Sequence, residues 1–188
     1  MVYNITMRVI SGKYKGRKLV APKNDARPTL DRAKETLFNI LGNISGTTVL
    51  DLFAGSGQVA LECLSRGAVR AVMCDNGRDA VAAINENFAK VGEKPELFRC
   101  EYGQCLRSLA TTGTTFDIVY VDPPYHAGYY NDVLRLLCSL NLLNPDGVIV
   151  CEHPADVTFE TPDDALTLFK QRKVGSVIFA FYKQVEPF

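Results

Sequence analysis

The residues at positions 51–57 (sequence D-L-F-A-G-S-G) are of types that suit the binding of a small charged molecule. They follow a predicted strand at Thr48–Leu52 and lead into a predicted helix at Gln58–Arg66. The glycines at 55 and 57 allow a sharp turn and the close approach of a ligand to the backbone. A G-x-G turn alone is weak evidence. With Ala60 it also satisfies the dinucleotide pattern G-x-G-x-x-G/A, so a nicotinamide-dependent oxidoreductase stays open.

A carboxylate before the glycines separates the two cofactor classes. Asp51 would repel a pyrophosphate, but it would attract the ammonium or sulfonium group of S-adenosylmethionine. Asp75 ends the next predicted strand, Ala71–Asp75, where a carboxylate can hold both hydroxyls of a ribose in either cofactor. No hydride-transfer partner is recognisable in the sequence. The pattern therefore favours S-adenosylmethionine over a nicotinamide cofactor.

A second loop, residues 122–125 (D-P-P-Y), follows the predicted buried strand Phe116–Asp122. Pro123 and Pro124 restrict the backbone and lack amide donors, which leaves carbonyl oxygens to accept hydrogen bonds from a guest. Asp122 adds a carboxylate acceptor, and Tyr125 adds a flat ring for stacking. This combination suits a planar group that carries an –NH₂, which is the exocyclic amine of adenine, cytosine or guanine, or an amide.

These two loops must be positioned by a regular scaffold, and the pattern after Gly46 predicts one. Apolar strands alternate with amphipathic helices, which is typical of a doubly wound α/β sheet with a ligand crevice at the carboxyl ends of its strands. The last two strands alternate around Gly175 and predict a closing antiparallel pair. The remaining predicted elements are helices at 78–90, around Leu106 and at 129–140, and strands at 97–100, 148–152, 166–173 and 176–183.

The amino-terminal part has a different character. Residues 7–22 predict short strands around a turn, and a helix follows with an apolar stripe from Leu30 to Leu41. Residues 1–37 hold nine basic and three acidic residues, whereas the remainder holds 12 basic and 18 acidic residues. The zero net charge therefore hides a basic arm on an acidic body. Such an arm suits a polyanion, although a solvated lysine-rich hairpin would have the same composition.

Composition excludes several classes of protein. With 188 residues, 47% hydrophobic and 22% charged, the chain is neither disordered, collagenous nor a coiled coil. We find no apolar run long enough to span a membrane and no signal-peptide pattern at the start. The six cysteines show no C-x-x-C spacing and there are two histidines, so we expect core thiols, no disulfide and no metal site. These features predict a cytoplasmic protein.

Longer motifs resemble a known family. The order D-x-F-A-G-S-G, an acid on the next strand, and then D-P-P-Y is similar to class I S-adenosylmethionine-dependent methyltransferases that act on exocyclic amines. Residues 8–19 (R-V-I-S-G-K-Y-K-G-R-K-L), 27–39 (R-P-T-L-D-R-A-K-E-T-L-F-N) and 61–68 (L-E-C-L-S-R-G-A) resemble the RsmD-type 16S rRNA guanine-N2 methyltransferases. The resemblance spans residues 8 to about 183. It departs at Ala60, where that family usually has glycine, and at Glu101.

The resemblance implies a Rossmann-like methyltransferase sheet at residues 43–188, with a basic hairpin and helix extension at residues 1–42 that faces RNA. It also implies S-adenosylmethionine as cofactor and 16S rRNA, alone or in a partly assembled subunit, as partner. The same loops serve DNA adenine and protein glutamine methyltransferases, which stay open as alternatives. The implied catalytic residues are Asp122, Pro123, Pro124 and Tyr125. The implied cofactor-binding residues are Asp51, Phe53, Ala54, Gly55, Gly57, Asp75, Asn76, Glu101 and Tyr102. The implied RNA-binding residues are Arg8, Lys13, Lys15, Arg17, Lys18 and Arg27.

Overall fold

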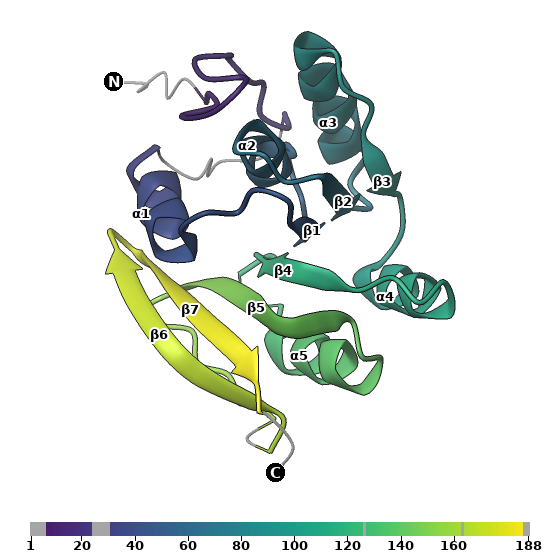
Figure 1. The fold of residues 1–188 in the computed structure, drawn as a ribbon, viewed down its shortest axis with the longest axis vertical. Coiled ribbons are helices and arrows are strands. Elements are labelled where there is room, and N and C mark those ends of the chain that lie inside the picture. Colours follow the sequence, from purple (N-terminus) through teal and green to yellow (C-terminus); the bar gives the residue numbers. More distant parts are fainter. Residues whose placement is uncertain (1–6, 24–30, 126, 163, 186–188) are drawn as a thin grey trace.

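The computed structural model describes residues 7–23, 31–125, 127–162 and 164–185. Within these residues, seven strands form one sheet in the order β3-β2-β1-β4-β5-β7-β6, and five helices flank it (Figure 1). The strands are β1 Thr48–Leu52, β2 Arg70–Cys74, β3 Glu96–Phe98, β4 Phe116–Val121, β5 Leu143–Pro154, β6 Leu166–Val174 and β7 Val177–Gln184. The helices are α1 Asp31–Leu41, α2 Gln58–Ser65, α3 Arg78–Val91, α4 Tyr102–Thr111 and α5 Tyr130–Ser139.

The sheet is parallel from β3 to β5, and β7 and β6 add an antiparallel pair at one edge. This confirms the predicted doubly wound sheet. From β1 the chain first winds outward through β2 and β3, and it then returns to place β4 on the other side of β1. The winding direction therefore switches between β1 and β4. Ligands of open α/β sheets bind outside the carboxyl ends of the strands at such a switch point.

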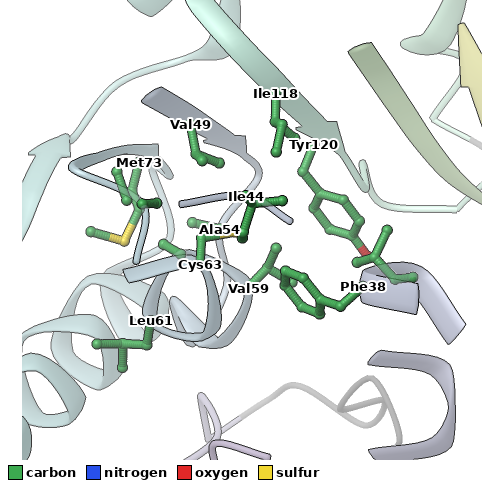
Figure 2. Close-up of a cluster of buried hydrophobic side chains, with 14 of the residues drawn as sticks. Phe38, Ile44, Val49, Ala54, Val59, Leu61, Cys63, Met73, Ile118 and Tyr120 are labelled. Carbon is green, nitrogen blue, oxygen red and sulfur yellow. The ribbon is translucent and has the colours of Figure 1, made fainter. Parts of the chain in front are cut away.

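Side chains alternate between the two faces of the sheet, and a separate apolar cluster covers each face. Val49, Ile118 and Tyr120 belong to the cluster that also includes residues of α1, α2 and α3. Figure 2 shows this cluster, with Phe38 of α1 beside Val59 of α2 and the ring of Tyr120 directed toward both. The neighbours of these strand residues in sequence enter the opposite cluster, against α4 and α5. No helix in the described part of the chain is long and apolar enough to cross a membrane.

The predicted elements are found, and most of their limits agree within two residues. β5 is longer than predicted and begins at Leu143, where its pairing with β4 is irregular. α4 covers ten residues rather than a short turn. The amino-terminal hairpin is shorter than predicted, because the antiparallel pairing of residues 7–23 is limited to one isolated bridge, between Arg8 and Lys18.

Backbone hydrogen bonds cross the hairpin on both sides of this bridge, but the amides nearer to its turn donate to α2 instead. Ile10 and Ser11 donate to the two carboxylate oxygens of Glu62, at 2.8 and 3.0 Å. Lys13 donates to the carbonyl oxygen of Ser65 at 2.8 Å. Glu62 is fully buried, and the equally buried Lys34 of α1 lies 3.7 Å from it and also donates to the Arg8 carbonyl. The arm, α1 and α2 are thus joined by one buried polar network.

Burial lowers the pKa of the Lys34 ammonium, and the nearby carboxylates of Glu62 and Asp31 oppose this shift. Removing one partner from such a pair leaves an uncompensated buried charge, which is strongly destabilising. The network therefore fixes where the arm lies, and an isolated arm would lose it.

Gly12 allows the arm to approach α2. Its φ is +79°, and a Cβ at this position would lie 1.8 Å from the Ser65 carbonyl oxygen. Gly16, in the same turn, has a φ of +83° but no atom within 4 Å of a Cβ. We predict that Gly16→Ala lowers the free energy of unfolding by about 1 kcal/mol, the cost of a left-handed backbone. Gly12→Ala should cost about 2–4 kcal/mol because it also displaces the arm.

Urea denaturation of both variants measures the difference. Equal losses would show that the arm does not depend on its contact with Ser65.

Candidate active site

The two loops singled out in the sequence lie side by side. β1 and β4 are neighbours in the sheet, with Leu52 paired to Val121, so the loops that follow them start from adjacent strands. Neighbouring strands are about 4.8 Å apart. The Asp51 carboxylate and the Asp122 loop therefore meet at the carboxyl edge of the switch point, where the sequence placed a crevice.

Asp51 lies within β1 and is 1% exposed. One of its carboxylate oxygens accepts a hydrogen bond from the Ala60 amide of α2, at 3.1 Å. Burial raises the pKa of the Asp51 carboxyl to about 7, the Ala60 hydrogen bond opposes the shift, and the negative charge of Asp75 adds to it. A buried carboxylate with a raised pKa costs stability, and such groups gather at functional sites. A cation beside Asp51 would relieve this cost.

Asp75 fastens the glycine loop to the end of β2. Its two carboxylate oxygens accept hydrogen bonds from the Gly55 and Gly77 amides, both at 2.8 Å. The Phe53 and Ala54 amides both donate to the Cys74 carbonyl at 3.0 Å, and Phe53 has a φ of +72°. Each oxygen of a carboxylate can accept two hydrogen bonds, so Asp75 keeps capacity for a guest hydroxyl.

The packing of the core requires a glycine at position 57. Its φ is +71°, and a Cβ would lie 3.2 Å from both Met73 and Phe88, which are core side chains. The next residue, Gln58, begins α2 and is 8% exposed. Among the described residues its side-chain oxygen has no hydrogen-bond partner. A buried acceptor beside the glycine loop suits a donor on a bound molecule.

Three aromatic rings from separate elements meet at this edge. Phe53 follows β1, Tyr102 begins α4, and Tyr129 precedes α5. The Phe53 and Tyr129 rings are stacked with centroids 6.1 Å apart, and the Tyr102 ring lies 5.4 and 5.2 Å from them. The Tyr102 hydroxyl donates to Asp132 at 2.9 Å, and burial followed by this bond raises its pKa to about 12. The rings offer a flat apolar surface for a planar group.

Two further candidate residues of the cofactor set, Asn76 and Glu101, are joined to each other. The Asn76 amide donates a hydrogen bond to the Glu101 carboxylate. Glu101 precedes the first turn of α4, and Tyr102 is its first residue. This bond links the end of β2 to the start of α4. Tyr129, by contrast, was not predicted as a site residue, although the sequence shows this tyrosine four residues after Tyr125.

The four residues of the D-P-P-Y loop differ in solvent exposure. Pro123 is buried, Asp122 and Tyr125 are half-buried, and Pro124 is exposed. The Pro124 carbonyl accepts a hydrogen bond from the Ala127 amide at 3.2 Å, which closes a turn. The loop therefore holds a carboxylate at the edge of the sheet with a tyrosine ring three residues further along the chain.

A second buried acid, Glu152 of β5, also lies near this edge and was not predicted as a site residue. It is 4% exposed, and its carboxylate accepts a hydrogen bond from the Tyr120 hydroxyl. Burial raises the pKa of Glu152 to about 7, while the Tyr120 bond opposes the shift. The Glu152 carbonyl accepts from the Tyr130 hydroxyl at 2.7 Å, which connects β5 to α5. This set supports the strand end that carries Asp122.

The arm carries the remaining candidate residues. The candidate cations that the structure describes, Arg8, Lys13, Lys15, Arg17 and Lys18, are all exposed. Arg8 is paired with Asp31 at 2.8 Å and Lys13 with Glu93 at 3.3 Å. Lys15, Arg17 and Lys18 form no ion pair with any carboxylate of the described residues. Arg27 lies outside the described residues.

Three thiols, those of Cys74, Cys100 and Cys105, lie close together where β2 ends and α4 begins. All six cysteines are free, and four of them are buried. In the part of the chain that the structure describes, no group of three or more His, Cys, Asp or Glu side chains is arranged to hold a metal ion.

Comparison with known proteins identifies relatives of this chain. The profile of the family named Conserved hypothetical protein 95 matches residues 7–183. The ribosomal RNA small subunit methyltransferase D of Haemophilus influenzae is 33% identical over 94% of this chain and 93% of its own length. The protein of that name from Escherichia coli is 33% identical over 95% of this chain and 90% of its own. The solved structure of yhhF from Escherichia coli is 33% identical, covers 96% of this chain and 98% of its own, and has a TM-score of 0.81.

The raised pKa of Asp51 predicts a pH-dependent stability. An unfolded aspartate loses its proton near pH 4, whereas the folded protein keeps this proton to about pH 7. The wild-type protein should therefore lose stability from this residue as the pH rises from about 4 to 7, by up to about 1.4 kcal/mol for each pH unit. Asp51→Asn keeps an acceptor for the Ala60 amide and carries no charge.

The advantage of Asp51→Asn over wild type should thus grow across this range, as urea denaturation at several pH values will measure. Glu152 shifts in the same direction, but it is common to both proteins and cancels in the difference. Parallel pH profiles would contradict the assignment.

Proposed function

Because the chain belongs to the Conserved hypothetical protein 95 family with the proteins named ribosomal RNA small subunit methyltransferase D, it is an rRNA methyltransferase that uses S-adenosylmethionine, and we propose that it methylates the N2 amine of a guanine in 16S rRNA. The observation that carries the proposal is the juxtaposition of two loops at the switch point of the sheet. One contains a buried carboxylate and glycines, and the other contains D-P-P-Y.

The residues at this edge fit S-adenosylmethionine. Asp51 supplies a buried negative charge whose cost a cationic ligand would relieve. Asp75 keeps acceptor capacity for ribose hydroxyls, and the Gln58 oxygen suits a donor. The cluster of Phe53, Tyr102 and Tyr129 suits a purine ring. We assign Asp51, Phe53, Ala54, Gly55, Gly57, Asp75, Asn76, Glu101 and Tyr102 to the binding of this cofactor. S-adenosylmethionine supplies a methyl group on a positively charged sulfur.

The D-P-P-Y loop holds the amine. Asp122 and the Pro123 carbonyl would accept hydrogen bonds from the two N2 protons of guanine, which raises the electron density on nitrogen and directs its lone pair. Tyr125 would stack on the base after it leaves its neighbours in the RNA. The amine would lose a proton only as the new nitrogen–carbon bond forms and the carbon–sulfur bond breaks, and the Asp122 carboxylate that holds this N–H would accept it, so a strong base is not needed. Most of the rate gain then comes from positioning and electrostatics.

The basic arm supplies the contact with RNA phosphates. Lys15, Arg17 and Lys18 are exposed and form no ion pair with the described carboxylates, so they are available to a polyanion. Arg8 and Lys13 would exchange a carboxylate for a phosphate. Arg27 completes the set that the sequence indicates. We propose that residues 1–42 form this RNA-facing extension and residues 43–188 the methyltransferase domain.

Asp122→Asn tests the active site. Asparagine keeps the shape and one acceptor oxygen but loses the charge that stabilises the amine as it becomes positive. We expect the single-turnover rate of methyl transfer to a 16S rRNA transcript to fall about 100-fold, with little change in cofactor or RNA affinity. The matched variant Tyr125→Ala should instead weaken RNA capture by about 1–3 kcal/mol.

Full single-turnover activity of Asp122→Asn would contradict the assignment of this carboxylate. Methyl transfer to duplex DNA or to a glutamine peptide, but not to rRNA, would favour the two alternative amines.

Neutralising the arm should change the salt dependence of RNA binding. The slope of log K against log salt is negative, and each lost phosphate contact reduces its magnitude by about 0.7–0.9. We expect Lys15→Ala/Arg17→Ala/Lys18→Ala to flatten the slope accordingly, with unchanged affinity for S-adenosylmethionine. The control Lys94→Ala/Arg107→Ala/Arg135→Ala removes three exposed cations outside the arm. An equal slope in both triple variants would show that the arm is a solvated surface.

A further inference from the structure

The β6–β7 hairpin carries a cationic surface that the proposed function does not use. Residues 166–184 hold four basic residues and no acid, whereas residues 38–165 hold 8 basic and 17 acidic residues. Lys170, Arg172 and Lys173 are exposed on the edge strand β6. None of the three forms an ion pair with a carboxylate in the described ranges. The hairpin is therefore a basic segment that follows a part of the chain with an excess of acidic residues.

Two of these cations lie on the same face of the sheet as the arm and α1. Lys170 is paired with Phe181 and Arg172 with Phe179 across the β6–β7 ladder. Directly opposed residues of antiparallel strands share a face. Both phenylalanines are fully buried in the cluster that also contains Met7 and Val9 of the arm and Leu37 of α1. Lys173 is next to Arg172 in sequence and thus lies on the opposite face.

A β-bulge adds an aromatic ring to this cationic face. β6 pairs Leu168 with Tyr182 and Lys170 with Phe181, so Phe169 is the extra residue between them. Bulges redirect side chains and are frequent next to functional sites. The Phe169 ring is 47% exposed, with its centroid 6.1 Å from that of Phe181. The Lys183 ammonium lies 5.7 Å from the Phe169 centroid and 3.8 Å from Asp146.

One end of the hairpin reaches the edge of the sheet that holds the D-P-P-Y loop. Arg172, aligned with Glu152 through Phe179, lies nearer to this edge than Lys183, which is aligned with Val148. β7 begins at Val177, which is paired with Pro154 at the carboxyl end of β5. The turn between β6 and β7 is therefore at the same edge as the D-P-P-Y loop. Two strands, β5 and β7, separate β6 from β4 in the sheet, so β6 lies about 14 Å from β4 at about 4.8 Å per strand. Figure 1 shows the end of β6 beside α1.

We propose that Phe169, Lys170, Arg172 and Lys183 form a second contact surface for the rRNA substrate, which takes an unpaired segment near the target guanine. The inference rests on the proposed function and extends it by a site. Cations beside an exposed ring bind single-stranded nucleic acid, because phosphates pair with the cations and a base stacks on the ring. Pairing of β6 with a second copy is disfavoured, because lysine and arginine on an edge strand oppose it.

Salt-dependent binding of a 16S rRNA transcript, followed by fluorescence anisotropy, tests the proposal with two matched variants. Lys170→Gln/Arg172→Gln removes the cations on the face of the arm. Lys173→Gln makes the same change at the next residue, on the opposite face. We expect the first variant to reduce the magnitude of the slope of log K against log salt by about 1.4–1.8. The second variant should leave this slope close to that of the wild type. Cofactor affinity should stay the same in both.

Phe169→Leu tests stacking separately. It keeps an apolar contact with Phe181 but removes the flat ring, so the fold should be retained, as the thermal midpoint will show. We expect the dissociation constant for the transcript to rise roughly five- to hundredfold. An unchanged constant would overturn the role of the ring.

Two other results identify the source of a failure. If the wild-type protein binds no RNA, the proposed function fails first. If the wild type binds RNA and Lys170→Gln/Arg172→Gln binds with the same slope, the second contact surface alone is wrong. Sedimentation velocity of the wild type and this variant completes the test. A dimer that is present only in one of them would assign the face to self-association and overturn the proposal.

Discussion

The parallel pairing of β1 with β4 is the constraint on which the site depends. The pairing of Leu52 with Val121 sets the starting points of two loops that are 65 or more residues apart in the chain. A shift of register would move Asp51 away from the Asp122 loop, and a one-residue shift would also turn every side chain to the other face. The two apolar clusters prevent such a shift, because each strand buries both of its faces.

The same scaffold connects the arm to the glycine loop. α2 begins directly after Gly57, and its Glu62 accepts hydrogen bonds from the arm at Ile10 and Ser11. Buried charges such as Lys34, Glu62 and Asp51 cost stability, and the protein retains them where they join separate elements or face the site. One short helix therefore relates the position of the basic arm to the position of the glycine loop.

The sequence predicted those features that depend on residues close together in the chain. The strand and helix order, the two loops and the antiparallel closing pair follow from apolar periodicity and from glycine and proline positions. The hairpin of the arm is shorter than predicted, because Glu62 and Ser65 accept hydrogen bonds from the amides nearer to its turn, and no local pattern shows contacts across 50 residues. Tyr129, Glu152 and the bulge at Phe169 were missed for the same reason. Their neighbours are set by strand order and register rather than by adjacent residues.

We propose that this fold presents a guanine amine of small-subunit rRNA to a methyl donor. Mass spectrometry of the nucleosides in 16S and large-subunit rRNA, from cells with and without the gene, tests this proposal. We expect N2-methylguanosine to fall by about one residue per 16S molecule when the gene is removed, and to return when the wild-type gene is restored. Unchanged N2-methylguanosine in 16S rRNA, or the loss of a different methylated nucleoside, would contradict it.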